Sequence, residues 1–255
     1  MNFDLASKLD VLPYRFSGKQ TPCSWDDEDI HSAEIVSLYK SGHSAYQERA
    51  STKKLETILP SLANTRELSV PFRTSRSFFE SICQMPSLER LTIYQPCQYD
   101  LEPIANLQHL THLSLGTNPN LDSLEPLKQL KKLVVIGIDG NYKQIKTLDT
   151  FGDMVWLRGL AIVAPDAGFL EFPTLDPLSG LRELEYLCLA GLRTGDKSLR
   201  ALCRMQRMQC LHIIGLSQWP KEQYELVHRS LPNLEDEELR LAATDPKFQR
   251  QHRIR

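Results

Sequence analysis

The chain has 255 residues, of which 41% are hydrophobic, and a formal net charge of −2 with charges of both signs spread along its length. Proteins dedicated to nucleic acids usually carry a basic excess, so we expect no nucleic-acid partner. No segment approaches the roughly 18 apolar residues that span a bilayer, and the first residues lack the basic start and apolar run of a secretory signal. We therefore expect no membrane association and a cytoplasmic location.

The six cysteines have neither Cys-x-x-Cys spacing nor a cysteine and histidine spacing typical of zinc sites, and the chain is long for a disulfide scaffold. We expect all six thiols to be reduced. Cys188, Cys203 and Cys210 fall inside the repeat pattern described below, where a thiol acts as a small apolar filler.

Residues 1–54 are predicted to form an N-terminal cap that includes a degenerate first repeat. Residues 1 to about 32 do not match the repeat, and Trp25 with the acidic run at 26–29 provides a polar lead-in. Two degenerate copies of the repeat core follow, Ala33-Val36-Leu38 and Thr65-Leu68-Val70.

From about residue 100, leucine or a close substitute recurs at every third position and then at a spacing of two, which neither an ordinary helix nor a simple strand produces. The cleanest run is Leu101, Ile104, Leu107, Leu110, Leu113 and Leu115. The series returns 23 residues later as Leu124, Leu127, Leu130, Leu133, Ile136 and Ile138. Asn118 and Asn141 each stand three residues after the last member, which completes L-x-x-L-x-L-x-x-N twice.

A second marker supports this register. An acid-Pro-aliphatic triplet precedes three of the cores at one offset, in residues 102–104, 125–127 and 176–178. Weaker cores are Leu88-Leu91-Ile93, Leu157-Leu160-Ile162, Leu184-Leu187-Leu189 and Met208-Leu211-Ile213. The first core positions are 33, 65, 88, 110, 133, 157, 184 and 208, and their mean spacing falls within the roughly 20 to 29 residues typical of this repeat.

The pattern resembles the leucine-rich-repeat family over about residues 55–239, particularly the short-repeat branch of internalins and phosphatase-regulating proteins. The resemblance implies an α/β solenoid, a horseshoe with parallel strands on the concave face and short helices and turns on the convex face. Other repeats depart from the family asparagine, which is replaced by Pro96, Pro165, Leu192 and Leu216. Those turns must satisfy their backbone groups differently.

The C-terminal part contains two predicted return helices, at 196–205 and at 221–231 after Pro220. A half-matching ninth repeat could start at Leu234. Residues 240–255 are basic with almost no apolar anchor, so we predict a flexible tail.

The third, fifth and seventh positions of each core point away from the ladder and form the concave face. In the middle of the chain these positions carry small residues such as Gly116, Gly137, Gly159 and Ala161. Larger residues flank them, namely Arg90, Tyr94 and His112 on one side and Tyr186 and His212 on the other. This arrangement predicts a groove for a partner element. The alternative is that small residues only relieve crowding between neighbouring strands.

The loops after the strands carry large aromatic residues that would share one rim, and aromatic side chains are favoured in binding hot spots. Phe172 before Pro173 and Trp219 before Pro220 could instead plug repeat ends or staple the next helix. The candidate partner-binding residues of the concave face and rim are Arg90, Tyr94, Tyr99, His112, Asp139, Tyr142, Phe169, Tyr186, His212 and Trp219.

The sequence contains no pattern typical of an active site. The seven histidines lack metal-ligand spacing, no phosphate loop or nucleophile-elbow motif is present, and the acidic runs at 26–29 and 235–238 are predicted to be solvated faces. His109 and His112 are three apart, but they fall on the outer turn and on the concave face, so they should not share a metal. We expect no cofactor and no metal.

The sequence therefore favours a monomeric, non-catalytic module that binds another protein through the concave face and the loop rim. One version of this hypothesis is an immunity protein that inhibits a bacterial toxin. An alternative is a regulatory or targeting subunit of a cytosolic enzyme such as a phosphatase, as the family resemblance implies. A third alternative is an enzyme in its own right, and no residue pattern favours it.

Overall fold

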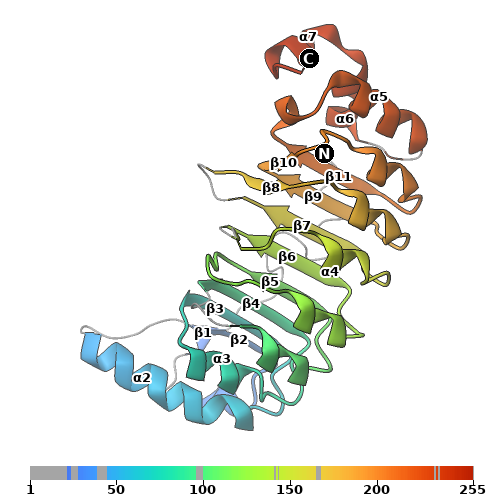
Figure 1. Cartoon of the computed structure of the whole chain (residues 1–255). Helices are drawn as coiled ribbons and strands as arrows, with labels where there is room; N and C mark the ends of the chain where they lie inside the picture. Colours follow the sequence, from blue (N-terminus) through green and yellow to red (C-terminus); the bar gives the residue numbers. More distant parts are fainter. Residues whose placement is uncertain are drawn as a thin grey trace.

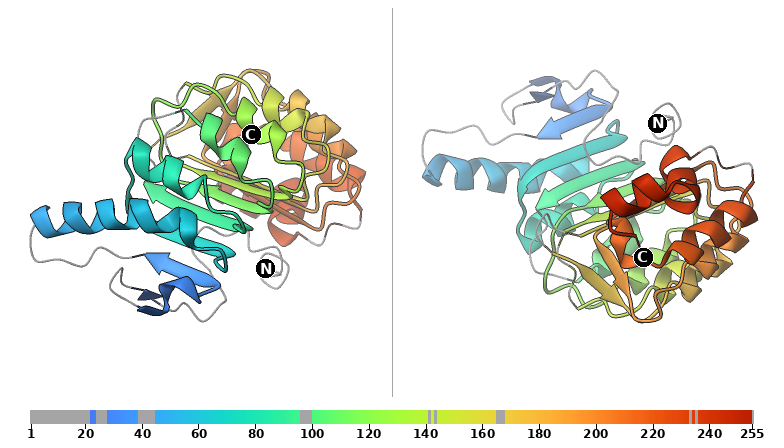
Figure 2. Two further views of the ribbon diagram at one scale, coloured as in Figure 1. Left: turned by 90° about the horizontal axis from the view of Figure 1, so that it is seen from below. Right: turned by 90° about the horizontal axis from the view of Figure 1, so that it is seen from above.

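The computed structural model describes residues 22–23, 28–38, 45–95, 100–140, 142, 144–164, 168–232, 234 and 236–254. Its centre is a nine-stranded parallel sheet whose strands follow one another in the order of the chain, except that β8 and β10 lie outside it. The sheet curves into an open arc (Figure 1). Strands line the inner, concave side of the arc, and helices and turns follow its outer, convex side (Figure 2).

The predicted repeat cores coincide with the strands. Each strand from β2 to β11 in the main sheet begins two residues after a predicted first core position, so the predicted register is confirmed. The strands of the main sheet are β1 (Pro22–Cys23), β2 (Ile35–Leu38), β3 (Glu67–Arg73), β4 (Arg90–Gln95), β5 (His112–Leu115), β6 (Val135–Asp139), β7 (Gly159–Val163), β9 (Tyr186–Ala190) and β11 (Cys210–Ile214).

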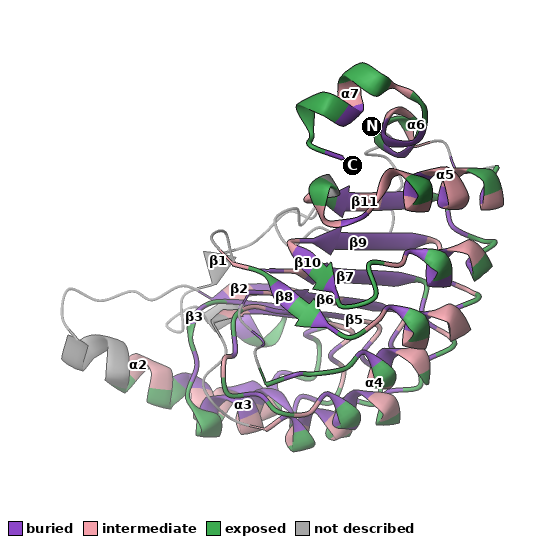
Figure 3. Cartoon of the chain, turned by 45° about the horizontal axis from the view of Figure 1, so that its top comes forward, coloured by how far each residue is buried: buried purple, intermediate pink, exposed green. Residues whose placement is uncertain are grey.

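The leucine ladder forms one continuous core. Equivalent residues pair across the sheet, for example Leu113 with Ile136 and Ile136 with Leu160. Each of these side chains is at most 2% exposed, and Figure 3 shows buried positions recurring along the strands. A single repeat would leave its apolar residues facing water, so the repeats stabilise one another by stacking.

The acid-Pro-aliphatic triplets begin the 3-10 helices of the convex side. Helices η3 (Glu102–Asn106), η4 (Glu125–Gln129) and η5 (Asp176–Gly180) each start at the acidic residue. Proline fits there because its fixed φ suits the first turn and the amide hydrogen that it lacks has no partner at that position. The aliphatic residue of each triplet is fully buried. The corresponding segments without proline are α4 (Asp149–Gly152) and η6 (Arg200–Arg204).

A second, two-stranded parallel sheet was not predicted. It pairs β8 (Leu170–Phe172) with β10 (Leu192–Thr194) on the loops that leave the main sheet. In each strand the outer residues are buried and the middle one is exposed. Leu192 begins β10, so this pairing supplies backbone partners at a turn where the family asparagine is missing. The turns at Pro96, Asn141 and Pro165 lie outside the described residues, whereas Asn118 is 1% exposed.

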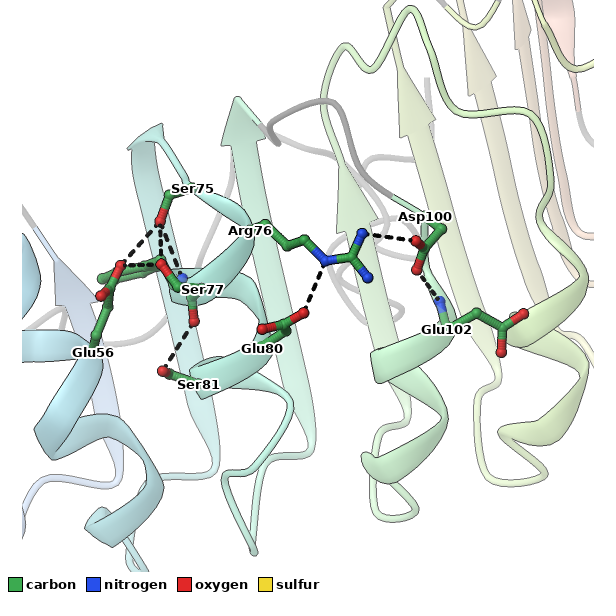
Figure 4. Close-up of polar contacts among 9 residues, drawn as sticks. Glu56, Ser75, Arg76, Ser77, Glu80, Ser81, Asp100 and Glu102 are labelled. Atoms are coloured by element: carbon green, nitrogen blue, oxygen red, sulfur yellow. Dashed lines mark hydrogen bonds and ion pairs between the residues drawn. The ribbon is translucent and has the colours of Figure 1, made fainter.

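The N-terminal helices are joined to the solenoid by buried apolar residues such as Leu55 and Leu59, which belong to the main core, and by polar contacts. Helix α2 (Ala45–Ile58) is followed by η2 (Leu59–Ser61) and packs beside α3 (Arg76–Ile82). Ser75 caps α3 by accepting a hydrogen bond from Phe78 N, and it donates to Glu56 of α2 (Figure 4). Arg76 bridges Glu80 and Asp100. These contacts link α2 to α3 and α3 to the next repeat.

The expected flexible tail is instead helical, which corrects that prediction. Helix α5 (Lys221–Ser230), reached through η7 (Leu216–Gln218), is followed by α6 (Glu237–Thr244) and α7 (Pro246–Gln251), so the described residues from Leu234 onward form helices and not the strand of a further repeat. Asp236 and Asp245 accept backbone hydrogen bonds at the starts of α6 and α7. This part of the chain contains few apolar residues, but Ala242 and Ile254 are buried. The capping hydrogen bonds offset part of the conformational entropy that is lost when the helices form.

Replacing Leu160 with Ala should lower the free energy of unfolding by about 2 to 5 kcal/mol, because it leaves a cavity where the side chain is 0% exposed. Urea denaturation followed by circular dichroism measures the change. Val155→Ala is the matched control, since Val155 is 52% exposed and its truncation should change stability by less than about 0.5 kcal/mol. Equal effects of the two substitutions would contradict a continuous ladder.

Candidate functional site

The outward-facing residues of the main sheet form rows that cross the strands in register, as the sequence analysis predicts for the concave face. The first row is Glu67, Arg90, His112, Val135, Gly159, Tyr186 and Cys210. The second row is Ser69, Thr92, Ser114, Gly137, Ala161, Cys188 and His212. The third row contains Asp139, Val163, Ala190 and Ile214, with Tyr94 of β4 and Gly116, directly after β5, at the same offset.

The N-terminal half of the concave face is polar and partly withdrawn from water. Burial raises the pKa of Glu67 and lowers the pKa of the Arg90 guanidinium beside it. The side chain of Tyr94 on β4 forms a hydrogen bond with the side chain of Ser69 on β3. His112 Nδ1 lies 2.8 Å from Thr111 Oγ1. Charged and polar groups that are partly desolvated interact more strongly with a ligand than fully hydrated ones do. This half can therefore recognise polar groups.

The C-terminal half of the concave face is apolar. A cluster of buried residues, here called the concave cluster, comprises Val135, Ala161, Tyr186, Cys188, Ala190 and Cys210. Tyr186 is 0% exposed, and its ring centroid lies 6.1 Å from that of His212. Burial raises the pKa of Tyr186 and raises the pKa of the Cys188 and Cys210 thiols to about 11. Ile214, at the edge of this half, is 60% exposed.

Two of the predicted floor glycines differ in their surroundings. A Cβ on Gly116 would overlap the backbone carbonyl oxygen of Tyr94, so this glycine is required by close packing of β4 and β5. A Cβ on Gly137 would meet the Ser114 hydroxyl oxygen at an ordinary 3.6 Å. Relief of crowding therefore explains Gly116 but not Gly137.

The structure changes the predicted aromatic rim. Tyr142 is 1% exposed and donates to the carbonyl oxygens of Leu115 and Gly116. Trp219 is 1% exposed, and its indole nitrogen donates to Thr194 Oγ1 at 3.3 Å. Both side chains are buried and bond to the preceding repeat. The prediction that they lie on an accessible rim was therefore wrong.

The other predicted rim residues have different positions. Phe169 is 43% exposed, with the Arg193 guanidinium 3.4 Å from its ring centroid. Phe172 is buried in β8, and Tyr99 lies outside the described residues. The sequence analysis did not include Arg193 among the candidate residues. Arg193 is the exposed middle residue of β10, between the buried Leu192 and Thr194, and such alternation of polar and apolar residues is typical of a strand.

Among the described residues, no group of three or more histidine, cysteine or acidic side chains is placed to hold a metal ion. Cys83, Cys188, Cys203 and Cys210 are free thiols. In the same part of the chain, no helix is long and apolar enough to cross a membrane.

Stability should decrease between about pH 8.5 and pH 11 because of Cys188 and Cys210. Their pKa is about 11 in the folded chain, whereas an unfolded thiol has a pKa near 8.5. The unfolded chain therefore releases protons in this window that the folded chain retains, and stability present at lower pH is lost as pH rises. Urea denaturation at several pH values should give a shallower decline for Cys188→Ala/Cys210→Ala. Parallel profiles would contradict the assignment.

No family model matches the chain, and no curated protein matches it. Among solved structures, internalin F from Listeria monocytogenes matches with a TM-score of 0.59 and 15% identity, over 85% of this chain and 66% of that chain. Internalin C2 from the same species matches with a TM-score of 0.53 and 18% identity, over 72% of this chain and 73% of that chain. A structure of TLR13 with ssRNA13 matches with a TM-score of 0.50 and 19% identity, over 81% of this chain and 29% of that chain.

This chain thus spans just under two thirds of internalin F. The matches agree with the in-register parallel strands and the recurring leucine core, and together these findings show that the chain has the fold of a leucine-rich-repeat solenoid.

Proposed function

We propose that this chain is a non-catalytic module that binds another protein through its concave face. The observation that supports the proposal most is the separation between the ladder and the three outward rows. The ladder residues form the continuous core, whereas the outward residues at the same strands do not belong to it, and six of them pack together separately as the concave cluster. Function has to be argued from this surface, because the fold alone serves many functions.

The surface offers both kinds of contact that a protein partner needs. Polar recognition would come from Arg90, Tyr94, His112 and Asp139, with His212 at the other end of the second row. Apolar contact would come from Ile214 at the edge of the face and from Phe169 on the adjacent loop, since both are exposed. Tyr186 is buried within the concave cluster of the same face. Aromatic and arginine side chains of this kind are enriched among the residues that dominate binding energy.

The identity of the protein that the chain binds in the cell would distinguish two more specific versions of this proposal. A toxin domain that the chain neutralises would support the inhibitor version, in which the module is an immunity protein. A housekeeping enzyme, such as a phosphatase, would support the regulatory or targeting version. Turnover of a substrate by the purified chain alone would overturn the non-catalytic assignment.

The space above Gly137 predicts a difference between two glycine substitutions. Gly137→Ala should leave the free energy of unfolding unchanged within about 0.5 kcal/mol, because the added methyl makes only ordinary contacts. Gly116→Ala should destabilise by about 1 to 3 kcal/mol, because the strands must separate to admit the methyl. Thermal and urea denaturation measure both. Similar losses in the two variants would mean that Gly137 is also required by packing.

Partner binding can then be tested by replacing Gly137 with arginine. Gly137→Arg projects a large charge from the second row and should reduce capture of the cellular partner about tenfold or more, because it fills the face without disturbing the ladder. Val155→Arg adds the same side chain at an exposed position outside the rows and should leave capture unchanged. Quantitative mass spectrometry of co-purified proteins provides the comparison, with urea denaturation to confirm equal stability. Equal recovery with Gly137→Arg would exclude the concave face.

A further inference from the structure

Of the three large hydrophobic side chains that the described part of the chain exposes, two lie close together. They are Phe169, just before β8, and Ile214, at the end of β11. The backbone of Gly191 lies between them, because its N–H donates to the carbonyl oxygen of Ile214 and its own carbonyl oxygen accepts from the N–H of Leu170. Two strand spacings, about 10 Å, therefore separate the backbones at these two exposed residues.

The two residues flank a corner where the main sheet passes into the two-stranded sheet. Strands β8 and β10 lie beside the ends of the main-sheet strands (Figure 1). Gly191 is the single residue between β9 and β10, and its φ of 65° is a left-handed conformation that glycine adopts readily. A Cβ at Gly191 would also come within 2.8 Å of the Ala164 Cβ. The turn at Gly191 sets Arg193, the exposed middle residue of β10, between the repeats of Phe169 and Ile214.

The guanidinium of Arg193 is oriented by its neighbours. Its central carbon lies 3.4 Å from the centroid of the Phe169 ring, and its Nε donates to Gln218 Oε1 at 3.0 Å. Its Nη1 lies 3.7 Å from Glu171 Oε1, which is too long for a hydrogen bond. Stacking on an aromatic ring and one hydrogen bond hold the planar group in place. The terminal nitrogens keep donors that no described residue accepts.

A cross-strand ion pair is the alternative role of Arg193, because Arg193 and Glu171 are register partners on β10 and β8. The Glu171 side chain is 73% exposed, and an ion pair at such exposure contributes little to stability. Glu171 can therefore move aside at low cost. An oriented guanidinium with so weak a partner is suited to bind a second carboxylate from outside the chain.

We propose that Phe169, Arg193 and Ile214, here called the corner patch, bind a protein segment that presents an aspartate or glutamate beside an apolar side chain. The carboxylate would accept two hydrogen bonds from the terminal nitrogens of Arg193, since the fork of a guanidinium matches the two oxygens of a carboxylate. The apolar side chain would contact Ile214 and the edge of the Phe169 ring. The corner patch would thus select the partner by both charge and apolar contact.

The surroundings of Arg193 favour a protein segment over other anions. A free small anion would gain nothing from the exposed apolar surface of Phe169 and Ile214, whereas an apolar side chain of a partner would bury this surface. A nucleic acid carries a phosphate at every nucleotide, and Glu171 beside Arg193 would repel such a row of negative charges. Arginine and aromatic residues set together are also typical of the positions that dominate protein binding energy.

This ligand chemistry deepens the proposed function and rests on it in one respect, namely that the ligand is a protein. Gly137 of the concave floor lies on β6, whereas the corner patch lies near β9 and β11, and β7 stands between β6 and β9 in the sheet order. Substitutions at the two places therefore report on different parts of the surface. Failure of the corner patch and failure of the proposed function are distinguishable.

The test selects short peptides of random sequence, displayed on phage, for binding to the full-length chain. Enriched peptides should contain an aspartate or glutamate close to an aromatic or aliphatic residue. They are then synthesised with acetylated and amidated ends, and replacement of the acid by its amide should weaken binding roughly tenfold or more. Enriched peptides without an acidic residue, or no enrichment at all, would overturn the proposal.

Substitutions in the corner patch should weaken binding of the acidic peptides. Arg193→Gln should lower the affinity roughly tenfold or more, and Arg193→Lys should not restore it, because an ammonium group lacks the planar fork. Ile214→Ser should lower the affinity about threefold or more through lost apolar contact. The matched controls Arg200→Gln and Val155→Ser change exposed residues elsewhere and should bind like the unaltered chain. Unchanged affinity in Arg193→Gln, or full affinity in Arg193→Lys, would overturn the proposed contact.

Phe169→Leu tests whether the ring positions the guanidinium of Arg193. This substitution keeps an apolar side chain but removes the aromatic face on which Arg193 stacks. The preference for the acidic peptide over its amide form should therefore fall about threefold, because the guanidinium is no longer held in one orientation. An unchanged preference would overturn the positioning role of Phe169.

Urea denaturation provides the control for folding, since all these variants should keep the midpoint of the unaltered chain. Arg193→Lys, which keeps the charge beside Glu171, carries the test if Arg193→Gln lowers that midpoint. Gly137→Arg separates the corner patch from the concave floor. Peptides lost with Gly137→Arg but retained with Arg193→Gln would support the concave face and overturn the corner patch. Peptides lost with Arg193→Gln but retained with Gly137→Arg would support the corner patch as a site that does not need the floor.

Discussion

The structure depends on one constraint, the identical register of neighbouring strands in the main sheet. Because Leu113, Ile136 and Leu160 pair in line, every inward position meets an apolar residue of the next repeat, and every outward position joins a row. A shift of one residue in any strand would turn its apolar side chains to the surface. The convex turns serve the same register, since each triplet helix starts ten residues before the strand that follows it. The concave rows exist only because the ladder holds the strands in line.

The elements that could be predicted are those in which a short sequence pattern alone determines the local structure. Strand starts followed from the leucine spacing, and the acid-Pro-aliphatic triplets marked the same register without predicting the 3-10 helices that begin at them. Tyr142 and Trp219 could not be placed in this way, because both occur in loops where the direction of a side chain depends on the neighbouring repeat. Tyr142 reaches back to carbonyl groups of the preceding turn, a contact between residues 26 and 27 positions apart. Helices α6 and α7 were missed for a related reason, since their few apolar residues are buried by packing of α6 against α5 and of α7 against α6, which the local sequence does not reveal.

The two halves of the concave face differ in a way that bears on recognition. Near β3 and β4 the outward residues are charged or hydroxylated, whereas near β9 and β11 they are aromatic, small or thiol-bearing. A ligand that bridges both halves needs polar groups at one end and apolar groups at the other, and this asymmetry would fix its direction along the arc. The sequence showed the flanking large residues and the small centre, but it could not show that Tyr186 is buried, because the burial of an outward residue depends on contacts beyond its own repeat.

The chain order of the strands has a further consequence for how the molecule folds. From β3 to β11, paired residues lie only 22 to 27 positions apart, which is about a tenth of the 255-residue chain. Such a relative contact order is typical of helical bundles rather than of sandwiches or barrels, where strands distant in sequence must meet. Each new repeat closes a loop of similar, modest length onto the repeat before it, so the entropic cost of loop closure is nearly the same at every step. A sheet of nine strands can thus assemble by successive local additions, without waiting for the two ends of the chain to find each other.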